Sequence, residues 1–351
     1  MAAPDGELDL GLRRFVLPLL FVVGLFVAVW LRRPDEPPPE PVPVEHFVEL
    51  GGPIFGTSWS AKVVPGDQPT EQAQSAIEAA LQRVDVQMST WRDDSELSRL
   101  NRHGTEPFPA SDGLRTVVAE AVRLHAVTGG AFDVTVDPLV KAWGFGPSDT
   151  VAPPSDEELA AARAKVDGDG LTVVGPTLVK NAPTLTVDLS AIAKGWAVDE
   201  AARALDALGL ERYLVEVGGE VRAHGTNARG VAWRVGVETP DGGVQDVFET
   251  VSLDGVAMAT SGNYRQLRTV DGRTVTHIID PRRGEPVDHG LGSVSVIAPT
   301  CVEADGLATA LYVLGADQGR RLADQQGWAA LFLTASPDGV QREASAAWPA
   351  Q

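Results

Sequence analysis

Cysteine is almost absent from this sequence, because Cys301 is the single one among 351 residues. One thiol excludes an intrachain disulfide and any cysteine cluster that holds zinc or iron–sulfur, so the redox compartment cannot be read from cysteine usage. Positive charge is also in short supply: 48 acidic residues outweigh 29 basic ones, and the net charge is −19. This balance argues against nucleic acid as a partner, since phosphates need a basic face. The common nucleotide motifs, G-x-G-x-x-G and the P-loop, are missing too.

One long apolar run stands near the N-terminus. Phe15–Leu31 has 17 residues without a charge, which is the short end of the roughly 17–25 residues that span a bilayer. The run is longer than the core of an ordinary signal peptide, and no clean A-x-A cleavage site follows it. We therefore expect an uncleaved transmembrane signal anchor (15–31) behind a cytoplasmic tail (1–14), with a cleaved signal as the alternative. Arginines flank both ends, so the positive-inside rule does not fix the orientation.

A spacer follows the apolar run. Residues 32–45 contain PDEPPPEPVPVE, whose proline and glutamate content favours a stiff, extended chain. The folded part is expected to begin near His46 and to form one domain from 46 to 351, because no composition break or long linker divides it. Hydrophobic residues make up 44% of the whole chain, which is typical of a globular protein with a hydrophobic core.

Helices and strands alternate irregularly along the folded part. Thr70–Val86 carries an apolar stripe at helical spacing, and Ser111–Thr128 predicts a second helix closed by two glycines. A Ser-x-x-Glu capping box at Ser155 predicts a third, short helix. Short apolar runs indicate strands that start at Leu171, Thr184, Tyr213, Trp233, Ser293 and Ala330. Several are joined by short turns, so we expect an α+β fold rather than a regular βαβ series.

The segment TCVEADGLATALYVLG, residues 300–315, predicts an apolar helix with two polar residues on one face. Asp305 and Thr309 lie four residues apart, and a carboxylate on such a helix is costly unless something pairs with it. Thr300-x-x-Glu303 is a capping box that would start the helix near residue 300. Asp305 then either favours the helix dipole alone, or joins Thr309 as a hard oxygen ligand for Mg²⁺.

Lys194 is expected in the turn or first helical turn after a strand that ends near Leu189. A lysine there suits an anion, because free backbone N–H groups point the same way, although a solvated lysine fits equally. GGAFDVTVDPLVKAWGFGP, from Gly129, combines small residues with aromatic rings that can line a flat ligand. The alternative for this stretch is a helix end followed by an irregular loop.

His277 stands at an expected strand end, before a turn at Asp280–Pro281. A histidine in such a place can act as a base near neutral pH, although a structural role is as common.

Eight blocks in one order resemble the ApbE family, the FAD:protein FMN transferases. They are FGTSWSAKV, MSTWRDDSELSRLN, GGAFDVTVDPLVKAWGFGP, VDLSAIAKGWAVD, YLVEVGGEVRAHG, ATSGNYR, HIIDPRRGEPV and EADGLATALYVLG. The resemblance extends from about Phe55 to Gly315, nearly the whole folded part. It implies that FAD is cleaved, that its FMN half is joined to a serine or threonine hydroxyl of a target protein, and that AMP leaves.

The resemblance also implies roles for individual residues. Mg²⁺ would be held by the side chains of Asp305 and Thr309 and by the backbone carbonyl of Ala191, and Lys194 would approach the FAD phosphates. His277 matches the general base for the acceptor hydroxyl. Positions that match flavin-nucleotide contacts are Phe55, Trp91, Ala131, Phe132, Asp133, Ile278 and Ala308. Phe55 stands where the family often has methionine, and Trp91 where tyrosine is also common.

Partners and location follow from the same resemblance. The acceptor would be an exported or membrane redox flavoprotein with a short Ser/Thr-containing motif. We expect a single-pass protein of the inner or plasma membrane whose catalytic domain faces the periplasm or the extracellular side. Two alternatives remain: an FAD pyrophosphatase that releases FMN and AMP, and a flavin-binding surface protein without turnover. The set of His277, Lys194, Asp305 and Thr309 argues against the second, since binding alone needs no base.

Overall fold

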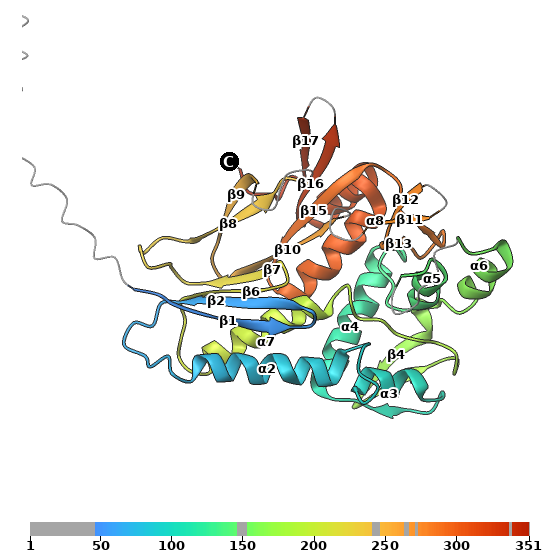
Figure 1. Cartoon of the computed structure of the whole chain (residues 1–351), viewed down its shortest axis with the longest axis horizontal. Coiled ribbons are helices and arrows are strands. Elements are labelled where there is room, and N and C mark those ends of the chain that lie inside the picture. The colour runs from blue at the N-terminus through green and yellow to red at the C-terminus, as the bar shows by residue number, and fades with distance from the viewer. Residues whose placement is uncertain are drawn as a thin grey trace, which may run out of the picture. The chain divides into compact units, whose positions relative to one another are not determined.

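An antiparallel sheet of eight strands organises the folded part of the chain (Figure 1). In order across the sheet the strands are β1 (Val48–Ile54), β2 (Thr57–Val63), β6 (Tyr213–Val217), β7 (Glu220–His224), β10 (Val256–Gly262), β15 (Leu291–Ala298), β16 (Ala329–Ser336) and β17 (Gly339–Ala344). Every neighbouring pair is antiparallel. The sheet therefore lacks the parallel crossovers of a βαβ protein, as the irregular order of elements in the sequence predicts.

The chain is represented by a computed structural model that describes residues 46–145, 153–240, 246–262, 267–270, 273–336 and 339–350. The expected tail, anchor and spacer (1–45) lie outside these residues. None of the helices in the described ranges combines the length and the apolar character that a membrane crossing requires.

Helices and small strand pairs complete the domain. The helices are α2 (Ala73–Met88), α3 (Glu96–Arg102), α4 (Asp112–Val127), α5 (Asp137–Ala142), α6 (Asp156–Arg163), α7 (Ala193–Asp206) and α8 (Cys301–Gln326), with a 3₁₀ turn at Gly168–Gly170. The small sheets pair β3 (Phe108–Pro109) and β4 (Leu171–Val174) with β5 (Thr177–Lys180), β8 (Trp233–Glu238) with β9 (Val247–Leu253), β11 (Leu267–Val270) with β12 (Arg273–Thr276), and β13 (Ile279–Asp280) with β14 (Glu285–Pro286).

Both faces of the central sheet are covered. On β16, Ala330 and Phe332 pack into the core under the helices, whereas Leu331 and Leu333 pack into a second core that includes the β8–β9 hairpin. Figure 1 shows α7 and α8 on one side of the sheet and β8–β9 on the other. A strand buried on both faces has no polar side, which is why ALFLT reads as an unbroken apolar run in the sequence.

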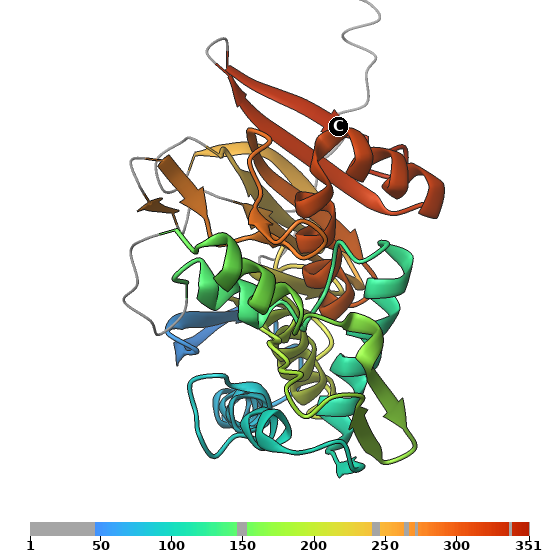
Figure 2. The same cartoon turned by 90° about the vertical axis from the view of Figure 1, so that its right-hand side faces the viewer.

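Three helical expectations are confirmed. α4 is capped by the Ser111 side chain, and α6 begins with the full capping box of Ser155 and Glu158. The helix over Thr70–Val86 exists as α2, although it begins at Ala73. The stretch from Gly129 is more regular than an irregular loop, because α5 forms within it; Figure 2 shows α5 and α6 toward the viewer.

The prediction of a strand that starts at Thr184 is wrong. Residues 184–187 form no strand, and the neighbouring β5 supplies the pairing with β4 instead. The reason is a side chain that takes the place of a partner strand. Asn101 accepts a hydrogen bond from the N–H of Val187 (2.8 Å) and donates one to its carbonyl (2.9 Å). A distant amide that satisfies both backbone groups leaves no signal in the local pattern.

Candidate functional site

Lys194 lies in the first turn of α7, as expected, where the helix leaves backbone N–H groups without intrahelical partners. Its ammonium forms an ion pair with the carboxylate of Glu220, which β7 places against the start of the helix. The Lys194 side chain is 35% exposed and the Glu220 side chain 3%. A ligand can therefore reach the lysine from solvent while the glutamate stays behind it.

Asp305 lies on the buried side of α8, facing the start of α7. Its residue exposure is 3%, and its Oδ2 accepts a hydrogen bond from the N–H of Gly195 at 2.9 Å. Burial raises the pKa of Asp305, while the nearby Lys194 ammonium acts in the opposite direction. The described residues donate no hydrogen bond to its Oδ1. The carboxylate that looked costly on an apolar helix is thus held by a helix start and a lysine.

Thr309 follows one turn later on the same face of α8. Its hydroxyl lies 3.0 Å from the hydroxyl of Ser261, near the end of β10. Ala191 precedes α7 by two residues and is partly buried against the main core. The α7 start and the α8 face therefore bring hard oxygen atoms and one ammonium to the same junction.

Glu220 gives this junction an unusual charge balance. Burial lowers the pKa of Lys194, but the carboxylates of Asp305 and Glu220 outweigh that effect, and the net shift is upward. Burial also raises the pKa of Glu220, to about 7. Within the described ranges the Oε2 atom of Glu220 is buried and has no hydrogen-bond partner. A buried oxygen without a partner marks a polar cluster that the described protein atoms leave incomplete.

Glu220 and Ser261 are the residues that sequence reasoning missed. Both stand in blocks that the sequence singled out only as glycine-rich turns beside strands. The sequence offers one signal for each residue, which is its position where a strand meets a turn: Glu220 comes two residues after Gly218, and Ser261 comes directly before Gly262. Their partners, Lys194 and Thr309, are 26 and 48 residues away in the chain.

The residues expected around the flavin fall into two groups. Ala131, Phe132, Ile278 and Ala308 are buried in the main core. Asp133 accepts hydrogen bonds from the N–H (2.7 Å) and the hydroxyl (2.6 Å) of Thr135, so it also holds its own loop. A flavin contact by this first group stays a prediction.

Phe55 and Trp91 form the second group: Phe55 is half-buried and packs against the edge of the main core, whereas Trp91 is exposed. Phe55 and Gly56 are the two-residue turn of the β1–β2 hairpin, with φ values of 50° and 73°. A phenylalanine in the left-handed region is strained, and such strain often marks a functional position. Trp91 is 75% exposed, so its ring is free to stack on a flat ligand.

His277 lies between β12 and β13, at the strand end where the sequence places it. Its half-buried ring makes an edge contact with Phe145, with centroids 6.5 Å apart. The neighbouring β13–β14 turn is tied to α5, because the indole N–H of Trp143 donates to the carbonyl of Gly284 (2.9 Å). His277 therefore stands on a different element from Lys194 and Asp305, and its reach to a reacting hydroxyl stays a prediction.

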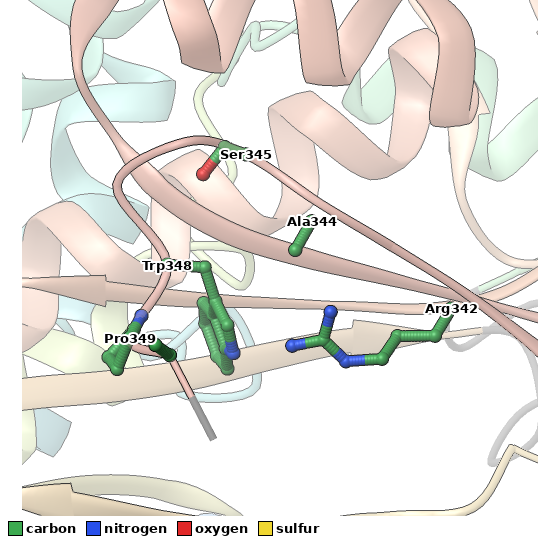
Figure 3. Close-up of a pocket in the computed structure, with 6 residues that line it drawn as sticks. Arg342, Ala344, Ser345, Trp348 and Pro349 are labelled. Atoms are coloured by element: carbon green, nitrogen blue, oxygen red, sulfur yellow. The ribbon is translucent and has the colours of Figure 1, made fainter.

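A hollow of about 370 Å³ near the C-terminus is not the site (Figure 3). It is lined by Arg342, Ala344, Ser345, Trp348, Pro349 and Ala350. Glu249 accepts a hydrogen bond from Arg342 Nε (2.7 Å) and another from Trp348 Nε1 (2.8 Å). These polar groups are already paired with each other, and the hollow contains none of the residues that the sequence selects.

Gly195 permits the close approach of α7 and α8, and a side chain at this position should push the two helices apart. A Cβ at this position would lie 2.2 Å from the carbonyl oxygen of Cys301 and 2.8 Å from Cβ of Asp305. We expect Gly195→Ala to lower the free energy of unfolding by about 1–3 kcal/mol, as overpacking typically does. Urea denaturation measures the change.

The matched control is Gly113→Ala in α4. There a Cβ would meet only the end of the flexible Gln87 side chain, at 2.7 Å. Alanine is the better helix former, so this variant should be neutral or slightly more stable. Equal stability of the Gly195→Ala variant and the wild type would show that the two helices are not in tight contact.

The oxygen atoms at the junction of α7 and α8 form an incomplete set of metal ligands. The described part of the chain has no group of three or more His, Cys, Asp or Glu side chains that could hold one. Asp305 and Thr309 offer one carboxylate and one hydroxyl, and Mg²⁺ is commonly bound by one or two carboxylates together with substrate phosphates. The residues fit Mg²⁺ on the condition that a phosphorylated substrate completes the shell.

Comparison with known proteins adds a family. The model of the ApbE family matches residues 55–332. An FAD:protein FMN transferase from Vibrio cholerae is 45% identical over 307 residues, and the match covers 86% of this chain and 91% of that protein. One from Haemophilus influenzae is 39% identical over 312 residues, and the match covers 86% of this chain and 90% of that protein. The solved structure of a flavin transferase ApbE from Vibrio cholerae matches with a TM-score of 0.79 and 44% identity, covering 86% of this chain and 98% of that one.

Proposed function

Because this chain belongs to the ApbE family, we propose that it transfers the FMN half of FAD to a serine or threonine hydroxyl of an acceptor protein and releases AMP. Relatives at 37–45% identity over most of the chain carry the name FAD:protein FMN transferase. The observation that carries the proposal is the junction of α7 and α8, where Lys194, Asp305 and Thr309 converge. An ammonium beside oxygen ligands suits a diphosphate.

Lys194 has the role of binding the FAD phosphates. Its ammonium is partly exposed, its pKa is raised by Asp305 and Glu220 over the effect of burial, and it therefore stays charged at neutral pH. A positive charge beside non-bridging oxygens offsets the negative charge that attack at phosphorus must overcome. Glu220 holds the lysine from behind, so the lysine is oriented before FAD arrives.

Asp305 and Thr309 have the role of metal ligands, with the carbonyl of Ala191 as a third. Bound Mg²⁺ supplies Lewis acidity at the phosphate oxygens. Asp305 is fixed for this role by the Gly195 N–H, which leaves Oδ1 without a protein donor among the described residues. Ser261 supports Thr309 through the contact of the two hydroxyls.

His277 has the role of general base. The acceptor hydroxyl gives its proton to the imidazole as its oxygen bonds to the FMN phosphorus, and the bond from that phosphorus to the bridging oxygen breaks. AMP leaves with the electron pair of that bond. A hydroxyl is a weak nucleophile, so this step needs a base within hydrogen-bond reach.

The alternative is hydrolysis, in which water replaces the acceptor and free FMN is released with AMP. Chromatography of the products separates the two, because transfer consumes FAD with AMP as the single small product, whereas hydrolysis releases AMP and FMN together. We expect AMP release to depend on an exported flavoprotein domain with a Ser/Thr motif. AMP and free FMN in equal amounts, with or without such a domain, would instead assign a pyrophosphatase.

Location belongs to the proposal as well. The catalytic domain is tethered by residues 15–31 and faces the periplasm or the extracellular side, where exported acceptors fold. The apolar run and the proline-rich spacer support this arrangement. Protease added to intact spheroplasts should digest the domain from His46 onward. Its survival until the membrane is broken would place it in the cytoplasm.

A further inference from the structure

The junction of α7 and α8 is held by two carboxylates that cross between the helices. Asp305 of α8 accepts the N–H of Gly195, in the first turn of α7. In the opposite direction, Asp199 of α7 accepts the N–H groups of Cys301 and Val302, each at 3.0 Å. These are the first two residues of α8. Each helix therefore satisfies free N–H groups at the start of the other.

The capping box expected from Thr300 and Glu303 is wrong for the same reason. Thr300 occupies the N-cap position but its side chain makes no capping hydrogen bond. Glu303 pairs instead with Arg123 of α4, at 2.7 Å. The N–H groups that a local cap would take are already bound by Asp199, which is 102 and 103 residues away from them in the chain. A tertiary contact therefore fixes where α8 begins.

Asp199 is itself held firmly. It is 2% exposed, and Nη1 of Arg222 donates to its Oδ1 at 2.8 Å and to the carbonyl of Pro299 at 3.0 Å. A buried carboxylate with an arginine and two backbone donors is fully paired, which offsets the cost of burying its charge. Arg222 also ties the residue just before the α8 cap to the same carboxylate.

One strand aligns the whole arrangement. Glu220 and Arg222 are two residues apart on β7, so their side chains point to the same face of the sheet. Glu220 pairs with Lys194, and Arg222 pairs with Asp199. Both partners belong to α7. The strand therefore sets the rotation and the height of α7, and Asp199 transmits that position to α8.

We propose that Asp199 is a positioning residue for the metal site. Asp305 comes four residues after Cys301, a rise of about 6 Å along the helix, so any shift of the first turn of α8 moves Asp305 relative to Lys194 and Ala191. The inference rests on the proposed function in assigning the metal to Asp305 and Thr309. Groups that orient metal ligands typically contribute about 10–100-fold to metal affinity or activity.

The test compares Mn²⁺ binding to full-length wild type and Asp199→Asn, measured by electron paramagnetic resonance in the presence of FAD. Asparagine keeps the shape but loses one acceptor atom and the charge that pairs with Arg222. We expect the Mn²⁺ dissociation constant to rise by about 10–100-fold. FMN transfer should require correspondingly more Mg²⁺ for half-maximal rate, while the rate at saturating Mg²⁺ stays within a few-fold of wild type.

The matched control is Glu96→Gln. Glu96 is also a buried carboxylate that supports a helix start from another element, because it accepts hydrogen bonds from the N–H and the hydroxyl of Ser111, the N-cap residue of α4, both at 2.6 Å. This variant should lose stability without any change in Mn²⁺ affinity. Equal weakening of Mn²⁺ binding in both variants would reduce Asp199 to a general stability role and overturn the inference.

A second variant covers the case in which Asp199→Asn does not fold. Arg222→Gln keeps Asp199 as the cap of α8 but removes its cationic partner, and it should weaken Mn²⁺ binding several-fold. Wild-type Mn²⁺ affinity in Arg222→Gln or in Asp199→Asn would overturn the inference about Asp199 and leave the proposed function untouched. Asp305→Ala reports on the proposed function separately. Undiminished Mn²⁺ binding by Asp305→Ala, or none by the wild type, would overturn the metal assignment and this inference with it.

Discussion

Asp305→Ala is expected to abolish Mg²⁺-dependent FMN transfer while the protein stays folded. The substitution removes the one carboxylate among the three proposed ligands, and the backbone N–H of Gly195 loses its acceptor. Folding should survive because Asp199 still holds the first turn of α8. Transfer rate against Mg²⁺ concentration measures the effect, and circular dichroism with thermal unfolding checks the fold.

Asp317→Ala is the control for this first expectation. Asp317 is an exposed carboxylate in the part of α8 that follows the kink at Gly315, and its removal changes net charge equally without touching the junction. The control should transfer FMN like the wild type. If Asp305→Ala keeps full activity at low Mg²⁺, the metal ligand has been placed on the wrong residue.

His277→Ala is expected to bind FAD normally and to transfer FMN slowly. Loss of a general base typically lowers the rate by about 10²–10⁴-fold, and nothing in the proposed role makes His277 a phosphate ligand. Single-turnover transfer at saturating FAD measures the chemical step, and quenching of flavin fluorescence measures FAD affinity.

His46→Ala is the matched control for the second expectation, because His46 is an exposed histidine at the start of the described chain. It should leave both the rate and the affinity unchanged. An unchanged transfer rate in His277→Ala together with weaker FAD binding would make His277 a binding residue, and another group would have to accept the proton.

Local patterns in the sequence predicted what depends on near neighbours. The four-residue spacing of Asp305 and Thr309 placed them on one face of α8, and Lys194 was placed in the first turn of α7. The capping box of Ser155 was recognised because both of its hydrogen bonds lie within three residues. Apolar runs located β6, β15 and β16 of the central sheet, and β4 and β8 of the small sheets, but they did not predict β1, β2, β7, β10 or β17.

Features that depend on contacts between residues far apart in the chain could not be predicted from the sequence. Thr300 was expected to cap α8, but Asp199 does so from another helix, and the run from Thr184 was expected to pair as a strand, but Asn101 binds Val187 instead. The pairing of Glu220 with Lys194 is of the same kind. In each case the partner is distant in the chain and is brought close only by tertiary packing, so no local pattern predicts it.

If this chain joins FMN covalently to a protein hydroxyl, the intact mass of an acceptor domain must increase. The full-length chain is incubated with FAD, Mg²⁺ and an exported flavoprotein domain that carries a Ser/Thr motif, beside the same domain with that residue replaced by alanine. We expect the first domain to gain the mass of one FMN phosphoester and the second to gain nothing. Free FMN in solution with no mass gain on the first domain would contradict it.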